Sequence, residues 1–350
     1  MPTKSIPNAI SIHINDLVYK EKLLGKDITT LSLGEAFFDL PQFSISSDMM
    51  EFGYHYSDSQ GLPSLRKKIC KHYKDKFNGV FDYNENLLIS SGSKIIIFMC
   101  LQYLLEEDDE AIIFEPAWLS YQHQITLVGS KPKLIPFDTP LSKVNQFITN
   151  ATKVLIINNP NNPSGKIYTR NELTTLYTLC LQHNIFMIID EAYSDFVIND
   201  QFTSMTSIDN QFKNLIVINS LSKNFGLSGW RIGFMIANNT LIQNILNINQ
   251  HLITCAPTIL QCYINDHFDE LLKATKPQII KLAEKRLLIQ NYIKSCGLKC
   301  LNGDTTFYFF IDLNDFDCDT IELSKKLLFE HQISVVPGEA YGKSTKKFIR

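Results

Sequence analysis

The stretch SLSKNFGLSGWRIGF, residues Ser220 to Phe234, follows a short apolar run that reads as a buried strand. Lys223 therefore stands just past a strand end, with Ser220 and Ser222 beside it and Arg231 eight residues further on. A lysine amine can form a Schiff base with an aldehyde, and two hydroxyls and a guanidinium suit a phosphate dianion. Together these residues indicate a site for pyridoxal phosphate (PLP) on an α/β fold.

Composition is compatible with a globular protein of two domains. The chain has 350 residues, of which 45% are hydrophobic, enough to bury a large core. With 33 basic and 36 acidic residues the net charge is −3, which does not indicate a nucleic-acid partner. No apolar run reaches the roughly 20 residues that span a bilayer, and the N-terminus lacks signal-peptide features. The eight scattered cysteines are expected to be reduced thiols of a cytoplasmic protein.

Apolar runs alternate with helical patterns through the first two thirds of the chain. The runs lack polar alternation, as expected for parallel strands covered on both faces. They lie at Leu87–Ser90, Ala111–Phe114, Val154–Asn158, Phe186–Asp190 and Leu215–Asn219. The helical patterns between them lie at Lys94–Leu105, Trp118–Val128 and Arg170–His183. This rhythm predicts an α/β fold whose large domain has a mostly parallel, doubly wound sheet.

Residues with useful chemistry follow these predicted strands. They are Ser91 to Ser93, Glu115 and Pro116, Asn159 to Gly165, Asp190 and Lys223. Because ligands of doubly wound sheets bind at the carboxyl ends of the strands, we expect these loops to meet around one ligand.

The pattern changes after about Asn238, where a smaller α+β domain is predicted. It has a helix at Lys276–Ser295, a strand at Thr306–Leu313, a helix at Thr320–Glu330 and a strand-turn-strand at Ile333–Arg350. The N-terminal segment is expected to complete it. We predict a large PLP-binding domain at 46–245 and a small domain formed by 1–45 together with 246–350.

Several motifs, in order along the chain, carry a family resemblance. They are LSLGEAFFDLP, YHYSDSQGLPSLRKKI, SSGSK, EPAWLSY, NNPNNPSG, IIDEAYSDF, SLSKNFGLSGWRIGF and VVPGEAYG. From about Leu31 to Arg350 the chain resembles fold-type I PLP-dependent aminotransferases of class I/II, the aspartate aminotransferase-like superfamily. The resemblance implies a homodimer with shared sites that acts on a small-molecule amino acid and a 2-oxo acid by a ping-pong mechanism.

The resemblance assigns the catalytic positions to Lys223, Asp190 and Tyr193. Asp190 would keep the pyridine nitrogen of PLP protonated, so that the ring accepts carbanion electrons; alone, it could equally be a helix N-cap. Tyr193 and Asn162 would contact the phenolic oxygen of the cofactor. Because Asn162 must point at the cofactor, we expect the Asn162–Pro163 peptide to be cis.

The phosphate of the cofactor is expected at the helix that follows the first predicted strand. Gly92, Ser93 and Lys94 open this helix, where backbone N–H groups favour an anion. Ser220, Ser222 and Arg231 would add further donors, the arginine through its fork. Neither SSGSK nor PSGK has the spacing of a nucleotide-binding P-loop. Lys94 is the rival of Lys223 for the Schiff base, and its place in the first helical turn makes it the poorer candidate.

Further cofactor and substrate residues are implied by the resemblance alone. Trp118 would stack on the PLP ring. Tyr56 would reach the cofactor phosphate of the neighbouring subunit. Gly34 and Asn162 would lie beside the substrate.

Arg350 falls where the resemblance places the arginine that binds the substrate carboxylate. Family members usually continue for another strand and helix. We expect Phe348 to Arg350 to pair with the strand at Val335 and Val336. We also expect this 350-residue form to bind PLP but to bind amino acids weakly, because the terminal carboxylate would compete for the guanidinium. A longer form should bind amino acids more tightly.

Two other activities share the same cofactor residues. One is a PLP-dependent carbon–sulfur β-lyase, which would release ammonia and pyruvate without a 2-oxo acid acceptor. The other is a non-catalytic PLP-sensing module, against which stands the lack of a helix-turn-helix or basic extension before the domain. Among transaminases, GWRIG with EPAWLSY favours amino acids over histidinol phosphate. No diagnostic charge indicates which amino acid side chain is bound.

Overall fold

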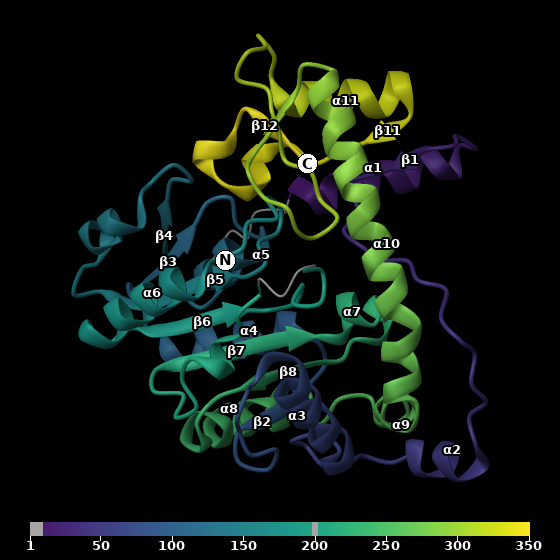
Figure 1. Ribbon diagram of the computed structural model, residues 1–350, viewed down its shortest axis with the longest axis vertical. Helices are drawn as coiled ribbons and strands as arrows, with labels where there is room; N and C mark the ends of the chain where they lie inside the picture. Colours follow the sequence, from purple (N-terminus) through teal and green to yellow (C-terminus); the bar gives the residue numbers. More distant parts are fainter. Residues whose placement is uncertain (1–9, 198–201) are drawn as a thin grey trace, which may run out of the picture.

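The fold was obtained as a computed structural model, which describes residues 10–197 and 202–350. Its larger part is a seven-stranded sheet with helices on both faces. Its smaller part, at the top of Figure 1, combines residues 10–30 with the C-terminal end of the chain. The α/β class and this two-part plan are those predicted from the sequence.

The large sheet has the strand order β2-β8-β7-β6-β5-β3-β4. Its strands are β2 (Leu87–Ser90), β3 (Glu110–Phe114), β4 (Lys131–Ile135), β5 (Thr152–Asn158), β6 (Phe186–Asp190), β7 (Leu215–Ser220) and β8 (Gly233–Ile236). β8 is antiparallel to both of its neighbours, and the other neighbouring pairs are parallel. All strands except β8 therefore point the same way, and the loops after them meet at one edge of the sheet.

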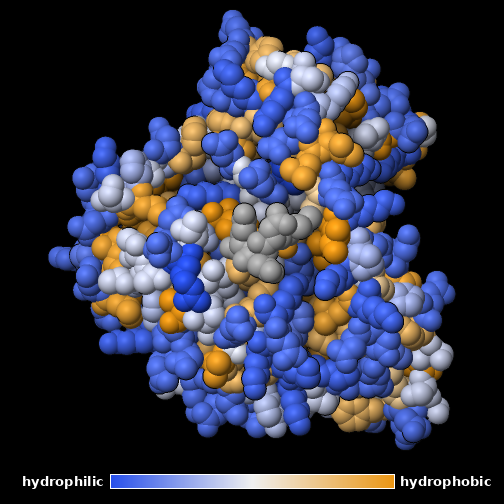
Figure 2. Space-filling model, viewed as in Figure 1, coloured by the Kyte–Doolittle hydropathy of each residue, from blue (hydrophilic) through white to orange (hydrophobic). Residues whose placement is uncertain are grey.

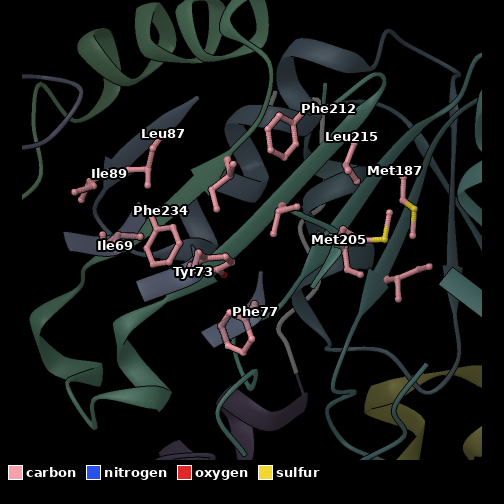
Figure 3. Close-up of a cluster of buried hydrophobic side chains, with 14 of the residues drawn as sticks. Ile69, Tyr73, Phe77, Leu87, Ile89, Met187, Met205, Phe212, Leu215 and Phe234 are labelled. Atoms are coloured by element: carbon pink, nitrogen blue, oxygen red, sulfur yellow. The ribbon is translucent and has the colours of Figure 1, made fainter. Parts of the chain in front are cut away.

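Alternate strand residues feed two separate cores, because successive side chains of a strand point to opposite faces. On one face Leu155, Met187 and Val217 pack with apolar residues of α3 and α6. Figure 3 shows part of this cluster, with Tyr73 and Phe77 of α3 beside Phe234 of β8. On the other face the intervening strand residues pack with α4, α5 and α8. Continuous apolar runs such as LIVIN are thus explained by burial on both faces.

The predicted segments Lys94–Leu105, Trp118–Val128 and Arg170–His183 are all largely helical, whereas the other helices of the large part were not predicted. The described helices of the large part follow in chain order. They are α2 (Ser47–Gly53), α3 (Pro63–Phe77), α4 (Ser93–Leu104), α5 (Ser120–Leu127), α6 (Arg170–Gln182), α7 (Leu221–Asn224), α8 (Asn239–Leu252) and α9 (Thr258–Asp266). Thr169 begins α6 with a capping box, in which its hydroxyl and the Glu172 carboxylate each bind a backbone N–H of the other residue. This capping box stabilises the start of the helix at Arg170, which is the predicted position.

Within the described residues, the small part contains short strands and three α-helices. They are α1 (Ile10–Leu23), β1 (Thr29–Thr30), α10 (Phe268–Ser295), β9 (Lys299–Cys300), β10 (Ile311–Asp312), α11 (Thr320–His331), β11 (Ile333–Ser334) and β12 (Phe348–Ile349). β1 pairs in parallel with β11, and Ile14 and Val18 of α1 share an apolar cluster with Leu328 of α11. The N-terminal segment therefore completes the small part, as expected. The long α10 connects the two parts along the right of Figure 1.

One predicted strand is much shorter than expected. Of Thr306–Leu313, only Ile311 and Asp312 pair with neighbouring strands. Thr306 has a φ of 61°, which is incompatible with a strand. The carbonyls of Thr305 and Tyr308 accept hydrogen bonds from the Arg286 side chain rather than from a sheet ladder. By contrast, the expected pairing near the C-terminus is confirmed, since Val336 and Arg350 exchange backbone hydrogen bonds of 3.1 and 2.8 Å.

The predicted domain boundary at residue 245 falls inside α8. Ile242 and Ile245 of α8 pack in the core of the large sheet, and Ile264, Phe268 and Leu271 join its other core. This packing favours a boundary within α10, and the division at 245 stays a prediction. In the part of the chain that the structure describes, no helix is long and apolar enough to cross a membrane. Hydrophilic residues dominate the face shown in Figure 2.

Candidate active site

A cavity of about 540 Å³ lies where the loops after the strands meet the small part. Its wall also includes residues of the N-terminal segment and the C-terminal residue. The predicted site residues that line it are Gly34, Ser93, Lys94, Trp118, Asn162, Asp190, Tyr193, Ser220, Ser222, Lys223, Arg231 and Arg350. The convergence expected from the sequence is therefore present in the fold.

Lys223 lies in α7, the short helix directly after β7. Ser220 caps this helix, and its side chain accepts a hydrogen bond of 3.1 Å from the backbone N–H of Ser222. The Lys223 ammonium donates to the carbonyl of Gly34, which belongs to the N-terminal segment. Burial lowers the pKa of Lys223 to about 8. A substantial fraction of this amine is therefore neutral near physiological pH, as a nucleophile requires.

Lys94, the rival lysine, lies at the other end of the cavity wall in the first turn of α4. Its ammonium is 5.2 Å from the centre of the Trp118 ring, a cation–π contact. Burial also lowers the pKa of Lys94, and the charge of Arg231 acts in the same direction. Both lysines line the cavity. Only Lys223 follows β7, which pairs with β6, the strand that ends in Asp190.

The start of α4 forms the end of the cavity best suited to an anion. Gly92 is the N-cap of α4 with a φ of 90° and provides no side-chain cap, so the first N–H groups of the helix face outward. A Cβ on Gly233 would lie 2.4 Å from the backbone nitrogen of Ser93, so only glycine allows β8 to approach this closely. The Arg231 guanidinium lies against Gly92 and donates to the carbonyl of Ser228 at 2.9 Å.

Asp190, at the end of β6, is buried and bonded on both carboxylate oxygens. One oxygen accepts a 2.7 Å hydrogen bond from the Tyr121 hydroxyl, and the other accepts a 3.0 Å bond from the backbone N–H of Ala192. Burial raises the pKa of Asp190, while these two hydrogen bonds act to lower it. The bond from the Ala192 N–H resembles the bond that a helix N-cap accepts. No helix directly follows Asp190 in the described residues, however.

Tyr121 was not predicted as a site residue. It lies three residues after Trp118 in the helical turn that begins α5, where such a spacing brings both side chains to one face. That spacing was the signal available in the sequence.

Asn162 and Tyr193 meet, as the resemblance implied. The Asn162 amide nitrogen donates to the Tyr193 hydroxyl at 3.3 Å, and the buried Asn162 amide oxygen has no hydrogen-bond partner among the described residues. A buried acceptor of this kind in a cavity wall is suited to a ligand donor. The Asn162–Pro163 peptide is cis, so this prediction is confirmed.

Asn158, which was not predicted, holds two site residues together. Its side chain donates to the carbonyl of Asp190 at 2.9 Å and accepts from the backbone N–H of Asn162 at 2.6 Å. Asn158 ends β5 and faces the same cavity. Its position at a strand end was a usable signal, although only later residues of the NNPNNPSG motif, which Asn158 begins, were predicted as site residues.

Arg350 reaches the cavity from the small part. Its guanidinium donates to the carbonyl of Ser32 at 2.6 Å and lies 4.6 Å from the centre of the Tyr308 ring. Tyr308 in turn is 2.7 Å from Tyr193, hydroxyl to hydroxyl. Nothing in the stretch GDTTFYFF pointed to Tyr308 as a cavity residue.

Tyr56 does not lie in this cavity. It is 81% exposed, in the segment between α2 and α3. Its assigned contact with a neighbouring subunit therefore stays a prediction.

The fold and this cavity are those of a class of amino-group-transferring enzymes, and comparison with known proteins places the chain within it. The sequence model of the family "Aminotransferase class I and II" matches residues 47–350. The chain therefore belongs to this family, and it is an aminotransferase.

Relatives cover nearly the whole chain. An aspartate aminotransferase of Pyrococcus abyssi is 29% identical over 93% of this chain and 87% of its own length. A (5-formylfuran-3-yl)methyl phosphate transaminase of Methanocaldococcus jannaschii is 30% identical over 100% of this chain and 94% of its own. The crystal structure of an aromatic aminotransferase from Pyrococcus horikoshii has a TM-score of 0.84 at 27% identity, covering 95% of this chain and 92% of that one.

Proposed function

We propose that this enzyme binds PLP through Lys223 and transfers the amino group of an amino acid to a 2-oxo acid in a ping-pong cycle. The observation that carries the proposal is one cavity in which a lysine of lowered pKa, a buried carboxylate and an arginine converge from three parts of the chain. A covalent amine, a partner for a pyridine nitrogen and a carboxylate clamp are the three groups that this chemistry needs.

The residues present fit the cofactor at each of its polar groups. The backbone N–H of Ser93 at the start of α4, the hydroxyls of Ser220 and Ser222, and Arg231 would hold the phosphate. The Gly92 N–H instead donates to the carbonyl of Ser90 at 2.7 Å. Trp118 offers an aromatic face for the ring. The side chains of Asn162 and Tyr193, whose amide nitrogen and hydroxyl are 3.3 Å apart, would contact the phenolic oxygen, to which the Tyr193 hydroxyl can donate. When bound, the cofactor supplies an electron sink for the carbanion formed at the amino acid.

The protein groups would divide the proton transfers between them. Lys223, once released by the substrate amine, would remove the α-proton as a general base and return it to the cofactor side. Asp190 would keep the pyridine nitrogen protonated, and Tyr121 would hold the Asp190 carboxylate in place. Arg350 would bind the substrate carboxylate through its planar fork, next to Gly34 and Asn162.

We also propose a homodimer with shared active sites. The segment that precedes α3 exposes several large apolar side chains, which a partner subunit would cover. They include Phe37 at 81%, Tyr54 at 75% and Tyr56 at 81% exposed. In such a dimer Tyr56 would donate to the cofactor phosphate of the partner subunit. Light scattering of the purified protein should give twice the chain mass of 40.1 kDa; a monomer at micromolar concentration would contradict this proposal.

The deciding experiment locates the cofactor linkage. The protein loaded with PLP is reduced with borohydride, digested, and the modified peptide is identified by mass spectrometry. We expect the adduct on Lys223, its loss in Lys223→Ala together with the absorbance of the lysine-bound cofactor, and its retention in Lys94→Ala. An adduct on Lys94 would overturn the assignment.

The substrate is addressed with a panel of amino donors and 2-oxo acid acceptors. Relatives act on substrates as different as aspartate and a furan-based phosphate, as their names state. Conversion of the lysine-bound cofactor by an amino acid, followed by recovery on adding a 2-oxo acid, supports transamination. Release of ammonia and pyruvate without an acceptor would instead indicate a β-lyase.

A further inference from the structure

Tyr308 touches two groups of the proposed site at the same time. Its hydroxyl is 2.7 Å from the hydroxyl of Tyr193, and the Arg350 guanidinium carbon lies 4.6 Å from the centre of its ring. It is 6% exposed and lines the cavity. A Cβ on Gly34 would be 2.3 Å from the Tyr308 hydroxyl, so the N-terminal segment packs directly on this side chain.

The loop that carries Tyr308 is held firmly. Arg286, buried in α10, donates to the carbonyls of Thr305 at 3.0 Å, Gly303 at 2.8 Å and Tyr308 at 3.1 Å. The Thr305 hydroxyl donates to the carbonyl of Gly165 at 2.7 Å. The loop is thus fixed to α10 on one side and to the NNPNNPSG loop on the other. A side chain fixed in this way can orient its neighbours.

We propose that Tyr308 is a positioning residue for both halves of the site: its hydroxyl orients the hydroxyl of Tyr193 towards the cofactor, and its ring orients Arg350 towards the substrate carboxylate. This inference rests on the proposed function. It gives Tyr308 a role both where the cofactor is bound and where the substrate is bound.

The first half of the argument concerns the hydrogen atoms. The Asn162 amide nitrogen can only donate, so the Tyr193 oxygen accepts from it. Burial raises the pKa of both Tyr193 and Tyr308, so both hydroxyls keep their hydrogens at neutral pH. When Tyr308 donates as well, both lone pairs of the Tyr193 oxygen are used. The Tyr193 hydrogen is then left for a ligand in the cavity.

The second half concerns the guanidinium. Arg350 lies over the ring of Tyr308 and 5.4 Å from the ring of Tyr341. One of its terminal nitrogens donates to the carbonyl of Ser32. The two rings and this carbonyl restrict the plane of the guanidinium, which is the condition for bidentate binding of a carboxylate.

Two substitutions separate the hydroxyl from the ring. Tyr308→Phe keeps the ring and removes the hydroxyl, whereas Tyr308→Leu removes both. Tyr341→Phe is the matched control, because it loses a buried hydroxyl near Arg350 that does not contact Tyr193. Each variant loaded with PLP is titrated with pH while the absorbance of the lysine-bound cofactor is followed, and KM and kcat are measured with one amino donor.

We expect Tyr308→Phe to raise the pKa of the lysine-bound cofactor by about 0.3 to 1 unit, the size of one ordinary hydrogen bond. The rise follows because a weaker Tyr193 donor stabilises the phenolate of the deprotonated form less. Tyr341→Phe should leave this pKa unchanged. The amino-donor KM should change less than about twofold in Tyr308→Phe and rise about fivefold in Tyr308→Leu, as the loss of a cation–π contact predicts.

The proposal is overturned if Tyr308→Phe titrates like the wild type, or if the phenylalanine and leucine variants raise KM equally. Should Tyr308→Leu fail to fold, Tyr308→Met provides the ringless variant. Failure of the proposed function has a different signature, because the wild-type protein would then show no lysine-bound cofactor to titrate.

Discussion

Glu115 is predicted to hold the segment that ends in Arg350. It follows β3 in the large part, is 5% exposed, and accepts backbone hydrogen bonds from Lys343 at 2.5 Å and Ser344 at 3.0 Å in the small part. The backbone N–H of Ala117 adds a bond of 2.9 Å to the carbonyl of Tyr341. The perturbation is Glu115→Gln, which preserves the shape of the side chain and removes its charge.

The size of the effect follows from these two bonds. Hydrogen bonds to a charged group contribute about 1.5–3 kcal/mol each. Glutamine keeps one acceptor oxygen and turns its NH₂ group towards the other N–H, so at least one bond is lost. We therefore expect hydrogen exchange at the amides of Lys343 and Ser344 to accelerate by about 10- to 150-fold. The amino-donor KM should rise by the reciprocal of the docked fraction, because only a docked segment places Arg350 in the cavity.

Hydrogen exchange with site resolution, measured alongside amino-donor kinetics, tests this reasoning. The matched control is Glu339→Gln in the same segment, where the carboxylate forms only a surface ion pair of 3.6 Å with Lys346. We expect this control to resemble the wild type, and PLP absorbance to be normal in both variants. Unchanged exchange at Lys343 in Glu115→Gln would refute the role of the carboxylate, whatever happens to KM.

Three further predictions concern the cofactor and substrate groups. Burial lowers the pKa of Lys223 to about 8 from the usual 10.5. The rate of PLP uptake by the apo-protein, followed by stopped-flow absorbance, should therefore rise with pH up to about pH 8 and then level off. A rate that still rises past pH 10 would contradict this prediction. Asp190→Asn should retain the cofactor and lose at least about 100-fold in kcat, with Asp190→Glu milder; near-normal turnover would leave Asp190 only its local bond to Ala192. Arg350→Lys should raise the amino-donor KM about tenfold without altering PLP binding, since lysine lacks the fork, and an unchanged KM would mean that another group binds the carboxylate.

Five strands and three helices of the large part could be predicted, because burial of the strands on both faces leaves continuous apolar runs in the sequence. Five apolar runs mark five of its strands. β4 was missed because its residues KPKLI are half polar, which an edge strand tolerates, and its Pro132 also argued against a strand. β8 was missed because its first two residues, Gly233 and Phe234, fall inside a motif that was read for its chemistry. For both β4 and β8, the neighbouring strands rather than their own residues determine that they join the sheet.

The candidate site could be predicted where a residue follows a strand, and it could not where the residue depends on a contact between distant segments. Lys223 and Asp190 belong to the first kind, since strand ends in a parallel sheet must meet. Tyr308 and Arg286 belong to the second kind. Their positions depend on a loop in which Thr306 has a positive φ, and no periodicity of the sequence indicates this loop. Glu115 was quoted within a motif, yet its partners lie more than 220 residues away and donate only backbone N–H groups.

The same division indicates where substrate specificity is encoded. The groups assigned to the cofactor come from the ends of the large sheet, whereas Ile12, Asn15 and Leu33, which also line the cavity, come from the N-terminal segment. That segment is held by the pairing of β1 with β11 and by hydrogen bonds of the Ser32 hydroxyl to Asn15 and Ser334. We therefore expect substitutions at Ile12 or Asn15 to alter the space beside the substrate while leaving Asp190, at the end of β6, in place. Lys223, by contrast, is linked to this segment by its hydrogen bond to the Gly34 carbonyl. The motifs do not indicate which amino acid is the substrate, because most of them carry residues assigned to the cofactor, and Ile12 and Asn15 lie outside all of them.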